Sequence, residues 1–456
     1  MGNRTTSKET TKETHKETPT LDLEEAWDSA DGPAVRQVTA VVVGCGERGQ
    51  NYAAFALDFP SRLKILGVAE PIAHRREKMR AQHGLEERLC VRDWPELLAL
   101  PRLADAVIVS TQDKDHKAPA VAFAKKGYHV LLEKPMAVTE SDCREIAAAC
   151  ESNGVYLAVC HVMRYFPPVV KIKEIIDSGA IGDVMTINHT ENVGYWHFAH
   201  SFVRGNWRSE AGSTFSLMAK CCHDMDLIYY WVGERPARSI QSFGSLQHFT
   251  EDNKPADASS NCLDCPAEEN CPYSARKIYL TNPVNSWPMS VVCDIEEDPG
   301  HYKQALTEAL REGPYGRCVY DCDNDVCDSQ MVNIQFEGGA IANLTMTAFT
   351  RDVCARYTRV TGTRGEIQWR DGDNKPIRVE DFLTGESRDV MPDMVAPPAR
   401  TRGHGGADFF LVNSFTKAVA RQDPSLIRSG PAASLASHMM VFRAEEGRRE
   451  NKVVTL

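Results

Sequence analysis

The sequence predicts an α/β protein: a doubly wound parallel sheet, followed by an α+β domain with a large open, mainly antiparallel sheet. Three observations support this prediction. A glycine-rich turn joins an apolar strand to a helix near the start of the chain. Strands and helices then alternate as far as about residue 163, which is typical of a parallel sheet with right-handed crossovers. After that point strands follow one another with little helix between them, which favours antiparallel pairing.

The most informative segment is residues 41–49, which read Val-Val-Val-Gly-Cys-Gly-Glu-Arg-Gly. Gly44, Gly46 and Gly49 form a G-x-G-x-x-G pattern where a strand turns into a helix. Glycines allow the tight bend there and let the backbone approach a pyrophosphate at the helix N-terminus. The strand and the helix that flank this turn are predicted at Gln37–Val43 and Glu47–Asp58.

A second strand, Leu63–Ala69, ends in Glu70, 21 residues after Gly49. A dinucleotide site needs an acceptor for the ribose hydroxyls roughly 20 residues after the glycines. A carboxylate at this place also repels the 2′-phosphate of NADP, so Glu70 favours NAD. Arg75 and Arg76 follow closely and moderate that preference.

The alternation of strands and helices continues through the first domain. We expect strands at Asp105–Ser110, Tyr128–Glu133 and Val155–Cys160, and helices at Lys114–Lys126 and Thr139–Asn153. Ligands bind at the carboxyl ends of the strands in such sheets. We therefore place a dinucleotide-binding domain at residues 37–163, after a tail at residues 1–36.

Residues 164–456 form the second predicted domain, which we expect to bind the substrate. Its expected strands are Asp183–Val193, Arg238–Gly244, Val332–Gly338, Ala340–Ala348, Thr358–Thr361, Glu366–Arg370 and Lys452–Leu456. Its expected helices are Phe215–Val232, Ala407–Ala420 and Ala432–Glu446, and Gly194–Glu210 reads as an aromatic and basic loop. A Cys-rich insertion occupies about residues 245–330, and loops of that length are functional, metal-held or disordered.

The composition excludes several classes of function. The chain has 456 residues, 42% of them hydrophobic, which suits a large core split over two or three domains. The net charge of −11 argues against nucleic-acid binding, which needs a basic surface. No apolar run approaches the roughly 18–20 residues of a membrane span, and no secretory signal is present. We therefore expect a cytoplasmic protein whose 15 cysteines are mostly reduced thiols.

The N-terminal tail has low complexity. Ser7–Thr18 consists of four-residue units that each end in Lys-Glu-Thr, and no large apolar residue occurs from Gly2 to Thr20. Such a segment cannot bury enough surface to offset its ordering entropy, so we expect disorder. Residues 1–6 also match the pattern for N-myristoylation, which would give weak membrane association in a eukaryotic host; a chance match is the alternative.

Two residues are candidates for proton chemistry. Lys134 lies in Glu133-Lys134-Pro135 at the end of the fifth strand, where Pro135 keeps its backbone out of a helix and its ammonium can polarise a substrate oxygen. His223 lies in an otherwise apolar helix and can take a hydroxyl proton near neutral pH. Taken alone, Lys134 also fits a surface lysine and His223 a satisfied core histidine.

Together these motifs resemble the glucose–fructose oxidoreductase, inositol dehydrogenase and rhizopine-catabolism (Gfo/Idh/MocA) family. The resemblance rests on the glycine loop, on Glu133-Lys134-Pro135 and on a later helix with His223-Asp224-Met225-Asp226. Two further landmarks are Thr361-Gly-Thr-Arg-Gly-Glu366 and Gly403-His-Gly-Gly-Ala-Asp408. The resemblance runs from about Val38 to the C-terminus. It implies a Rossmann domain, an open antiparallel sheet, and hydride transfer between NAD(P) and a sugar, cyclitol or related compound.

Carried over to this sequence, the resemblance makes Lys134 and His223 the catalytic pair. The family usually has an aspartate four positions before this histidine, but here that position is Ala219, followed by Lys220. The resemblance therefore leaves the route of the proton undetermined. We expect Lys220 or a residue of 195–208 to fill the space that the aspartate would occupy. The cofactor-binding residues expected are Gly44, Gly46, Glu47, Arg48, Gly49, Glu70, Thr111, Gln112, His116, Glu133, Lys134 and Arg164.

The substrate contacts are expected from the second domain. Aromatic and basic side chains crowd residues 195–208, where rings would stack on sugars and cations would bind hydroxyls or an anion; an interface with another subunit is the alternative. His404 lies in a glycine-rich turn that lets it approach a ligand. The substrate-binding residues expected are Lys134, Tyr195, Trp196, His197, Arg204, Trp207, Arg208, Lys220, His223 and His404. We also expect a homo-oligomer, a dimer or tetramer formed through the C-terminal sheet.

The insertion contains a candidate metal site. Cys262, Cys265 and Cys271 form C-x2-C-x5-C, and three thiolates so close in sequence predict a zinc ion with Cys318 as the fourth ligand. The composition of the insertion does not by itself predict an ordered structure, and a bound metal would order it. Nothing ties this cluster to the nicotinamide, so the predicted zinc is structural; free thiols are the alternative.

The sequence therefore predicts an NAD-dependent oxidoreductase that acts on the CH–OH group of a sugar, cyclitol or related polyhydroxy substrate. In this prediction His223 is the general acid and base, and Lys134 positions and polarises the oxygen. One alternative is a glycosidase or lyase that keeps NAD bound and oxidises its substrate transiently. Another is a non-catalytic NAD-binding regulator, suggested by Ala219 and the lysine–glutamate tail.

Overall fold

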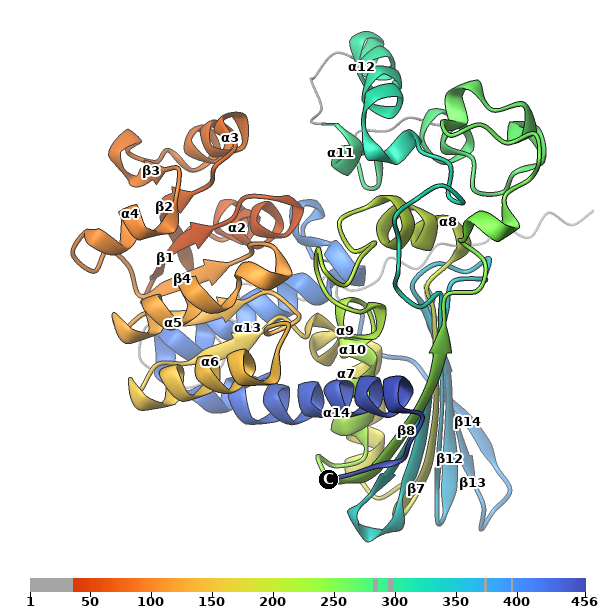
Figure 1. Ribbon diagram of the computed structural model, residues 1–456. Helices are drawn as coiled ribbons and strands as arrows, with labels where there is room; N and C mark the ends of the chain where they lie inside the picture. The colour runs from red at the N-terminus through yellow and green to blue at the C-terminus, as the bar shows by residue number, and fades with distance from the viewer. Residues whose placement is uncertain (1–35, 282–285, 294–298, 373–374, 395–396) are drawn as a thin grey trace, which may run out of the picture.

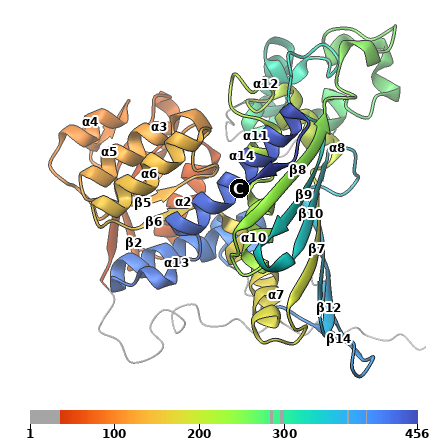
Figure 2. The ribbon, with the colours of Figure 1, turned by 60° about the horizontal axis from the view of Figure 1, so that its bottom comes forward.

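The computed structural model describes residues 36–281, 286–293, 299–372, 375–394 and 397–456 (Figure 1). The predicted N-terminal tail and its acylation pattern lie outside the described residues. Within the described ranges the chain forms two sheets that stand side by side, each with helices packed on it (Figures 1 and 2). The predicted fold class is confirmed.

The first sheet has six parallel strands in the order β3-β2-β1-β4-β5-β6. The strands are β1 Val38–Val43, β2 Leu63–Ala69, β3 Cys90–Val91, β4 Ala106–Val109, β5 His129–Leu132 and β6 Leu157–Val159. Helices cover both faces, and this is why the strands are continuous apolar runs. The strand order reverses between β1 and β4, which is where such sheets bind ligands.

Five helices connect these strands. They are α2 Glu47–Asp58, α3 Ala73–His83, α4 Trp94–Ala99, α5 Lys117–Lys125 and α6 Glu140–Ser152. The first of them, α2, buries Tyr52 and Phe55 completely and begins directly after Gly46, which has no side chain to cap it. The N–H groups of its first turn are therefore left for a ligand.

The second sheet has nine strands in the order β14-β13-β12-β11-β7-β10-β9-β8-β15. They are β7 Val184–Asn192, β8 Ala237–Ser245, β9 Ser329–Phe336, β10 Ile341–Thr347, β11 Ala355–Gly362, β12 Gly365–Arg370, β13 Ile377–Asp381, β14 Ser387–Val390 and β15 Val454–Thr455. Only β7 and β10 pair in parallel. Helices pack on one face, and the other face is open (Figure 2), so buried and exposed residues alternate along β9.

The helices of the second domain join the two halves. They are α7 Pro167–Asp177, α8 Tyr195–Phe198, α9 Ser216–Ala219, α10 Cys222–Trp231, α11 Met289–Val292, α12 Pro299–Glu312, α13 Ala407–Arg421 and α14 Pro431–Glu450. Helix α13 packs against α2, and α14 lies between β8 and α6; both views show this return to the first domain (Figures 1 and 2). Met439 of α14 accordingly belongs to the core of the first sheet. No helix among the described residues is long and apolar enough to cross a bilayer.

The insertion between β8 and β9 is compact where it is described. It has short turns, α11 and α12, and it stands beside α8 at one end of the second sheet (Figure 1). Its own apolar core is formed by Cys262, Leu263, Ala275, Tyr279, Met289, Tyr302, Leu306, Leu310 and Tyr315.

Two local predictions are wrong. The single helix expected at Phe215–Val232 is two helices, α9 and α10, which Lys220 and Cys221 separate, because the backbone leaves helical geometry at Cys221. The loop expected at Gly194–Glu210 instead begins with α8, which continues as a π-helical turn at Ala199–Arg204. Both segments contact residues that are distant in sequence: Ala219 is bound by Lys134, and Arg204 binds the Arg317 carbonyl.

Arg164 fastens the end of the first domain to the second. It is 1% exposed, and its guanidinium donates to both oxygens of Asp226 at 2.6 and 2.9 Å. It also donates to Glu234 at 2.6 Å and to the Arg428 carbonyl at 3.0 Å. We expected Arg164 to bind the cofactor; these contacts occupy its guanidinium and assign it to domain packing instead.

We predict that Arg164→Met lowers the free energy of unfolding by about 3–5 kcal/mol, because it leaves the buried Asp226 carboxylate without its partner. The measurement is urea unfolding followed by circular dichroism. Arg208→Met is the control, since its ion pair with Asp323 is part-exposed and is worth under about 1 kcal/mol. Equal losses in the two variants would contradict the assignment.

Candidate active site

The glycine loop forms a cradle over the start of α2. Gly44 has a φ of +87°, and a Cβ on Gly49 would lie 2.0 Å from the Gly44 carbonyl oxygen. A Cβ on Gly46, in contrast, would meet no atom within 4 Å. Open space at Gly46 beside uncapped helix N–H groups fits a bound pyrophosphate. Glu47 is exposed on the first turn.

Two buried hydroxyls next to this cradle lack protein partners. The Oγ of Ser110 and the Oγ1 of Thr111 follow β4, and neither forms a hydrogen bond with any described residue. The Gly44 backbone packs against the Ser110 carbonyl, so both hydroxyls lie beside the glycine loop. Buried polar groups need partners, and a bound dinucleotide would supply them.

Glu70 binds the backbone of the glycine loop. Its carboxylate accepts hydrogen bonds from the backbone N–H groups of Cys45 at 2.6 Å and Ile72 at 2.9 Å. The side chain is 4% exposed. A carboxylate can accept about four hydrogen bonds, so Glu70 retains acceptor capacity for a ribose beside the loop.

Arg48 links three parts of the site. Its guanidinium donates to Glu133 at 2.7 Å and to both oxygens of Asp408 at 2.9 and 2.7 Å. Burial opposes ionisation of Asp408, but the charges of Arg48 and His404 hold its pKa far below the ordinary value. Arg48 therefore ties α2 to the Glu133-Lys134-Pro135 segment and to α13. It was expected to bind the cofactor; its described contacts are these ion pairs and a hydrogen bond to the Tyr52 hydroxyl at 2.6 Å.

The loop after β4 holds the neighbouring segments in place. The Nδ1 of His116 donates to the Pro135 carbonyl at 2.7 Å, so this predicted cofactor residue braces the segment that carries Lys134. Asp113 accepts from the indole N–H of Trp207 at 2.8 Å. Gln112 accepts from Asn206 at 3.0 Å.

Lys134 reaches the break between α9 and α10. Its ammonium donates to the Ala219 carbonyl at 2.9 Å and lies 5.4 Å from the centre of the Trp207 ring. In a continuous helix the Ala219 carbonyl would accept from the backbone N–H of His223. Because the helix is broken here, the Ala219 carbonyl is free to accept from Lys134. The main chain at position 219 therefore binds Lys134, although the Ala219 side chain carries no carboxylate.

His223 lies at the start of α10, close to Lys134. It is 5% exposed, and its Nδ1 forms no hydrogen bond within the described part of the chain. Burial, followed by the charge of Lys134, lowers the pKa of His223 well below its ordinary value. The imidazole is therefore neutral and able to accept a proton.

Lys220 is partly buried beside this centre. Its ammonium lies 3.3 Å from Glu191 and 3.0 Å from the Sγ of Cys354. The Nδ1 of His197 lies 3.2 Å from the same sulfur, and burial and the charge of Lys220 lower the pKa of His197 well below its ordinary value. Lys220 thus does not face solvent.

His404 stands at the edge of the centre. Its ring lies 6.3 Å from that of His223, and its Nδ1 lies 3.1 Å from Asp408. It is exposed and has a φ of +51°. The structure thus brings Lys134, Trp207, His197, Lys220, His223 and His404 into one neighbourhood.

Other residues expected to bind substrate face the insertion instead. Arg204 is fully buried and donates to the Arg317 carbonyl at 2.7 Å and to the Cys262 sulfur at 3.3 Å. Arg208 donates to Asp323 at 2.9 Å. The rings of Tyr195 and Trp196 pack on Tyr273 and Trp287 at 6.2 and 5.3 Å. The described contacts of Arg204 and Arg208 are thus to the insertion; Arg204 is buried there, whereas Arg208 stays partly exposed.

The four predicted metal ligands line one small cavity. Cys262, Cys265, Cys271 and Cys318 surround a space of about 20 Å³, with Arg204 at its wall. Burial raises the pKa of Cys271 and Cys318, and the neighbouring Cys262 raises both further. Nevertheless, no group of three or more His, Cys, Asp or Glu side chains among the described residues is arranged to hold a metal ion.

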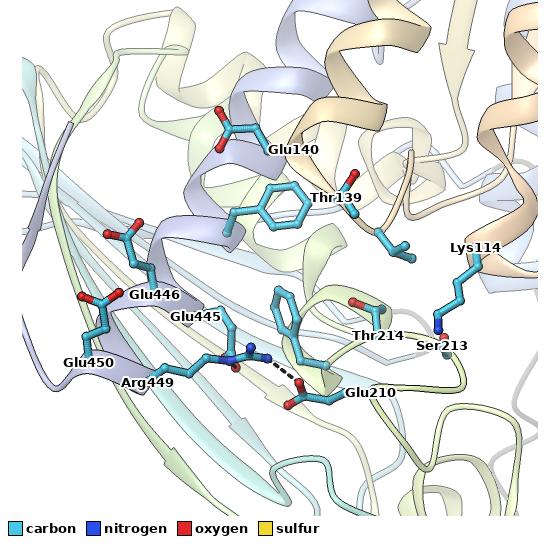
Figure 3. A pocket seen from close by; sticks show the side chains of 13 residues that line it. Lys114, Thr139, Glu140, Glu210, Ser213, Thr214, Glu445, Glu446, Arg449 and Glu450 are labelled. Carbon is cyan, nitrogen blue, oxygen red and sulfur yellow. Dashed lines mark hydrogen bonds and ion pairs between the residues drawn. The ribbon is translucent and has the colours of Figure 1, made fainter.

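A hollow of about 560 Å³ lies between the first domain and α14 (Figure 3). Lys114 and Thr139 line it on one side, and an ion pair between Glu210 and Arg449 crosses the other side (Figure 3). Neither Lys134 nor His223 is part of its lining. We therefore do not assign this hollow to the reaction.

Sequence reasoning missed three residues at the centre. His161 lies two residues after the end of β6 and contacts His223; its place near the carboxyl end of a parallel strand was the available signal. Asp113 holds Trp207, and Glu191 pairs with Lys220. Nothing in the local sequence of Asp113 or Glu191 indicates these distant partners.

Both halves of the chain match models of one oxidoreductase family. A model described as "Oxidoreductase family, NAD-binding Rossmann fold" matches residues 38–161, and one described as "Oxidoreductase family, C-terminal alpha/beta domain" matches residues 173–407. The putative oxidoreductase YteT of Bacillus subtilis is 25% identical over 349 residues, which are 71% of this chain and 78% of that protein. The 2,7-anhydro-N-acetylneuraminate hydratase of Escherichia coli is 28% identical over 208 residues, 45% of this chain and 53% of that protein.

A solved structure shows the same fold. The inositol dehydrogenase homologue of Azotobacter vinelandii, complexed with NADH and myo-inositol, has a TM-score of 0.64 at 15% identity, covering 92% of this chain and 98% of that one. The two family models together span more than half of the chain, in the order that the fold requires. The chain therefore belongs to the Gfo/Idh/MocA family of oxidoreductases, whose first domain is an NAD-binding Rossmann fold.

Proposed function

We propose that the chain transfers a hydride between NAD and a sugar, cyclitol or related polyhydroxy substrate. The observation that carries the proposal is the position of Lys134, whose ammonium lies 2.9 Å from the Ala219 carbonyl and close enough to His223 to lower its pKa. An ammonium beside a buried neutral imidazole suits the removal of a hydroxyl proton.

Each residue has a distinct role in this proposal. Gly46 and the start of α2 bind the pyrophosphate, Glu70 binds the ribose hydroxyls, and NAD when bound supplies the hydride acceptor. Lys134 stabilises negative charge on the substrate oxygen. His223 takes the hydroxyl proton and returns it in the reverse direction.

The substrate class is supported by the family members. The Azotobacter protein is complexed with myo-inositol, and the Escherichia coli relative is named for an anhydro sugar acid. Aromatic faces pack on the C–H faces of polyhydroxy compounds. Trp207 lies beside Lys134, and Trp196 and Trp287 lie beside His197, so the centre suits such a substrate.

A second candidate is cleavage or hydration with NAD recycled in each turnover. The relative named as a hydratase favours it, since that name describes no net oxidation. The same proton chemistry at Lys134 and His223 would serve a transiently oxidised substrate. NADH accumulates during turnover only in the first candidate, so absorbance at the NADH band separates the two.

We further propose that two or more copies associate through the open face of the second sheet. Phe243 and Met331 pair across β8 and β9 and are more than half exposed, and Met185 and Ile341 extend the apolar surface across β7 and β10. Exposed apolar surface of this kind is typical of protein–protein interfaces.

We also propose one structural zinc ion in the insertion. Four thiols share one cavity, and tetrahedral thiolate coordination is what zinc prefers. The Nη1 of the buried Arg204 has no partner among the described residues, and its cation would offset the negative charge of such a centre. The thiols would have to turn towards the ion, since their described arrangement does not hold one.

We predict that Lys134→Ala and His223→Ala each lower kcat with a polyol such as myo-inositol by about 10²–10⁴-fold. NADH binding, measured by fluorescence titration, should stay close to wild type, because neither side chain supports the glycine loop. Lys117→Ala and His83→Ala are controls in the same domain. A variant of the pair that keeps full turnover would rule out the assigned role.

We predict that Glu70→Ala weakens NAD binding and reduces the preference for NAD over NADP, because the ribose acceptor is lost. Calorimetric titration of both dinucleotides measures the two affinities. Glu77→Ala, an exposed carboxylate on α3, should change neither. Wild-type protein that binds NADP as tightly as NAD would overturn the assignment of Glu70.

We predict that protein purified without a polyhistidine tag contains about one zinc ion per chain, since four thiolates close one tetrahedral site. Cys265→Ser should lose the metal and expose the insertion to proteolysis, whereas Cys90→Ser, a thiol in the first domain, should keep it. Metal analysis by mass spectrometry is the measurement. Zinc-free wild type with four reactive thiols would disprove the site.

A further inference from the structure

His223 has no carboxylate to support it once it is protonated. It is buried, and no ion pair or hydrogen bond joins its ring to an acidic side chain in the described ranges. The groups that face it are Lys134, His161, Arg356 and His404. A proton on His223 would therefore meet cations and imidazoles but no carboxylate, which disfavours it.

His161 is the nearest unexplained group. It is 0% exposed, and neither of its ring nitrogens forms a hydrogen bond with any described residue. Its ring lies edge-on to that of His223, 5.8 Å between centres. Its Nε2 lies 3.9 Å from the Oδ1 of Asp226. His161 thus lies close both to the proposed base and to a carboxylate.

The unsatisfied nitrogens point to a polar molecule between the two rings. A buried polar group without a partner costs about 1–3 kcal/mol, and His161 and His223 together leave three such nitrogens. Water bound between buried polar groups commonly makes two to four hydrogen bonds. A water at this place would connect the two imidazoles.

We propose that His161 is a positioning residue that shares the proton of His223. The N–H bond on His223 breaks, the proton crosses the bridging water, and an N–H bond forms on His161, where the Asp226 carboxylate stabilises the charge. Only the proton moves. Asp226 stays ionised because Arg164 donates to both of its oxygens. This role rests on the proposed function of His223 as the base.

The surroundings of His161 act in both directions. Burial lowers the pKa of His161 below its ordinary value; Asp226 and Glu133 favour its protonation, and Arg164 and Lys134 oppose it. A third ring, His438, lies 5.3 Å away. Its Nδ1 donates to the Ser434 carbonyl and its Nε2 accepts from the Met136 N–H, so it cannot take a proton without losing a bond.

The test measures the pKa of His223 in NADH-saturated protein by NMR of ¹⁵N-labelled imidazoles. If the proton is shared, His161→Gln lowers the pKa of His223 by at least about half a unit, roughly threefold in proton affinity. If His161 acts only as a nearby positive charge, its removal raises that pKa or leaves it unchanged, and either result overturns the proposal. His161→Asn repeats the test with a smaller amide.

His438→Gln is the matched control, because it alters a buried ring that contacts His161 but not His223. It should leave the pKa of His223 unchanged; an equal fall would indicate packing and contradict the relay. The wild type gives a test that needs no variant: a shared proton requires two coupled titration steps for His161 and His223, and two independent steps would refute it. None of these measurements needs turnover, so they stand apart from the search for a substrate.

Discussion

The contacts of Arg48 are the constraint on which the site depends. One guanidinium binds Glu133 at the end of β5 and both oxygens of Asp408 at the start of α13. Removing either carboxylate would leave this guanidinium with one ion-pair partner and would break one of the links between these elements. Arg48 therefore fixes the helix that follows the glycine loop, the residue before Lys134 and the turn that carries His404 relative to one another.

The charges around the reaction centre are balanced by unusual partners. Lys134 is held by a main-chain carbonyl that a helix break sets free. Lys220 and Arg356 lie near the centre, but Glu191 and Asp224 neutralise them, with Arg356 2.8 Å from Asp224. The imidazole of His223 is therefore left neutral in surroundings that disfavour its protonation.

The local sequence was sufficient to predict some of these features. The glycine loop, Glu70 and Lys134 lie at strand ends, where backbone geometry alone determines which edge of the sheet they occupy. The helix break at Lys220 could not be read in the same way. The freed Ala219 carbonyl accepts a hydrogen bond from the Lys134 ammonium, 85 residues away, and helical periodicity carries no information about such a contact.

What the sequence determined by itself is the class of the fold, the position of the cofactor loop and the family of oxidoreductases, because each follows from short-range patterns in a fixed order. The tertiary structure decided which polar side chains share the site. Arg164, Arg204 and Arg208 resemble ligand-binding residues in sequence, yet their guanidinium groups are bound to Asp226, to the Cys262 sulfur and to Asp323. His161 was passed over, yet it lies against His223. A charged side chain is assigned to packing or to chemistry by the partners that the fold brings to it, and those partners are distant in the chain.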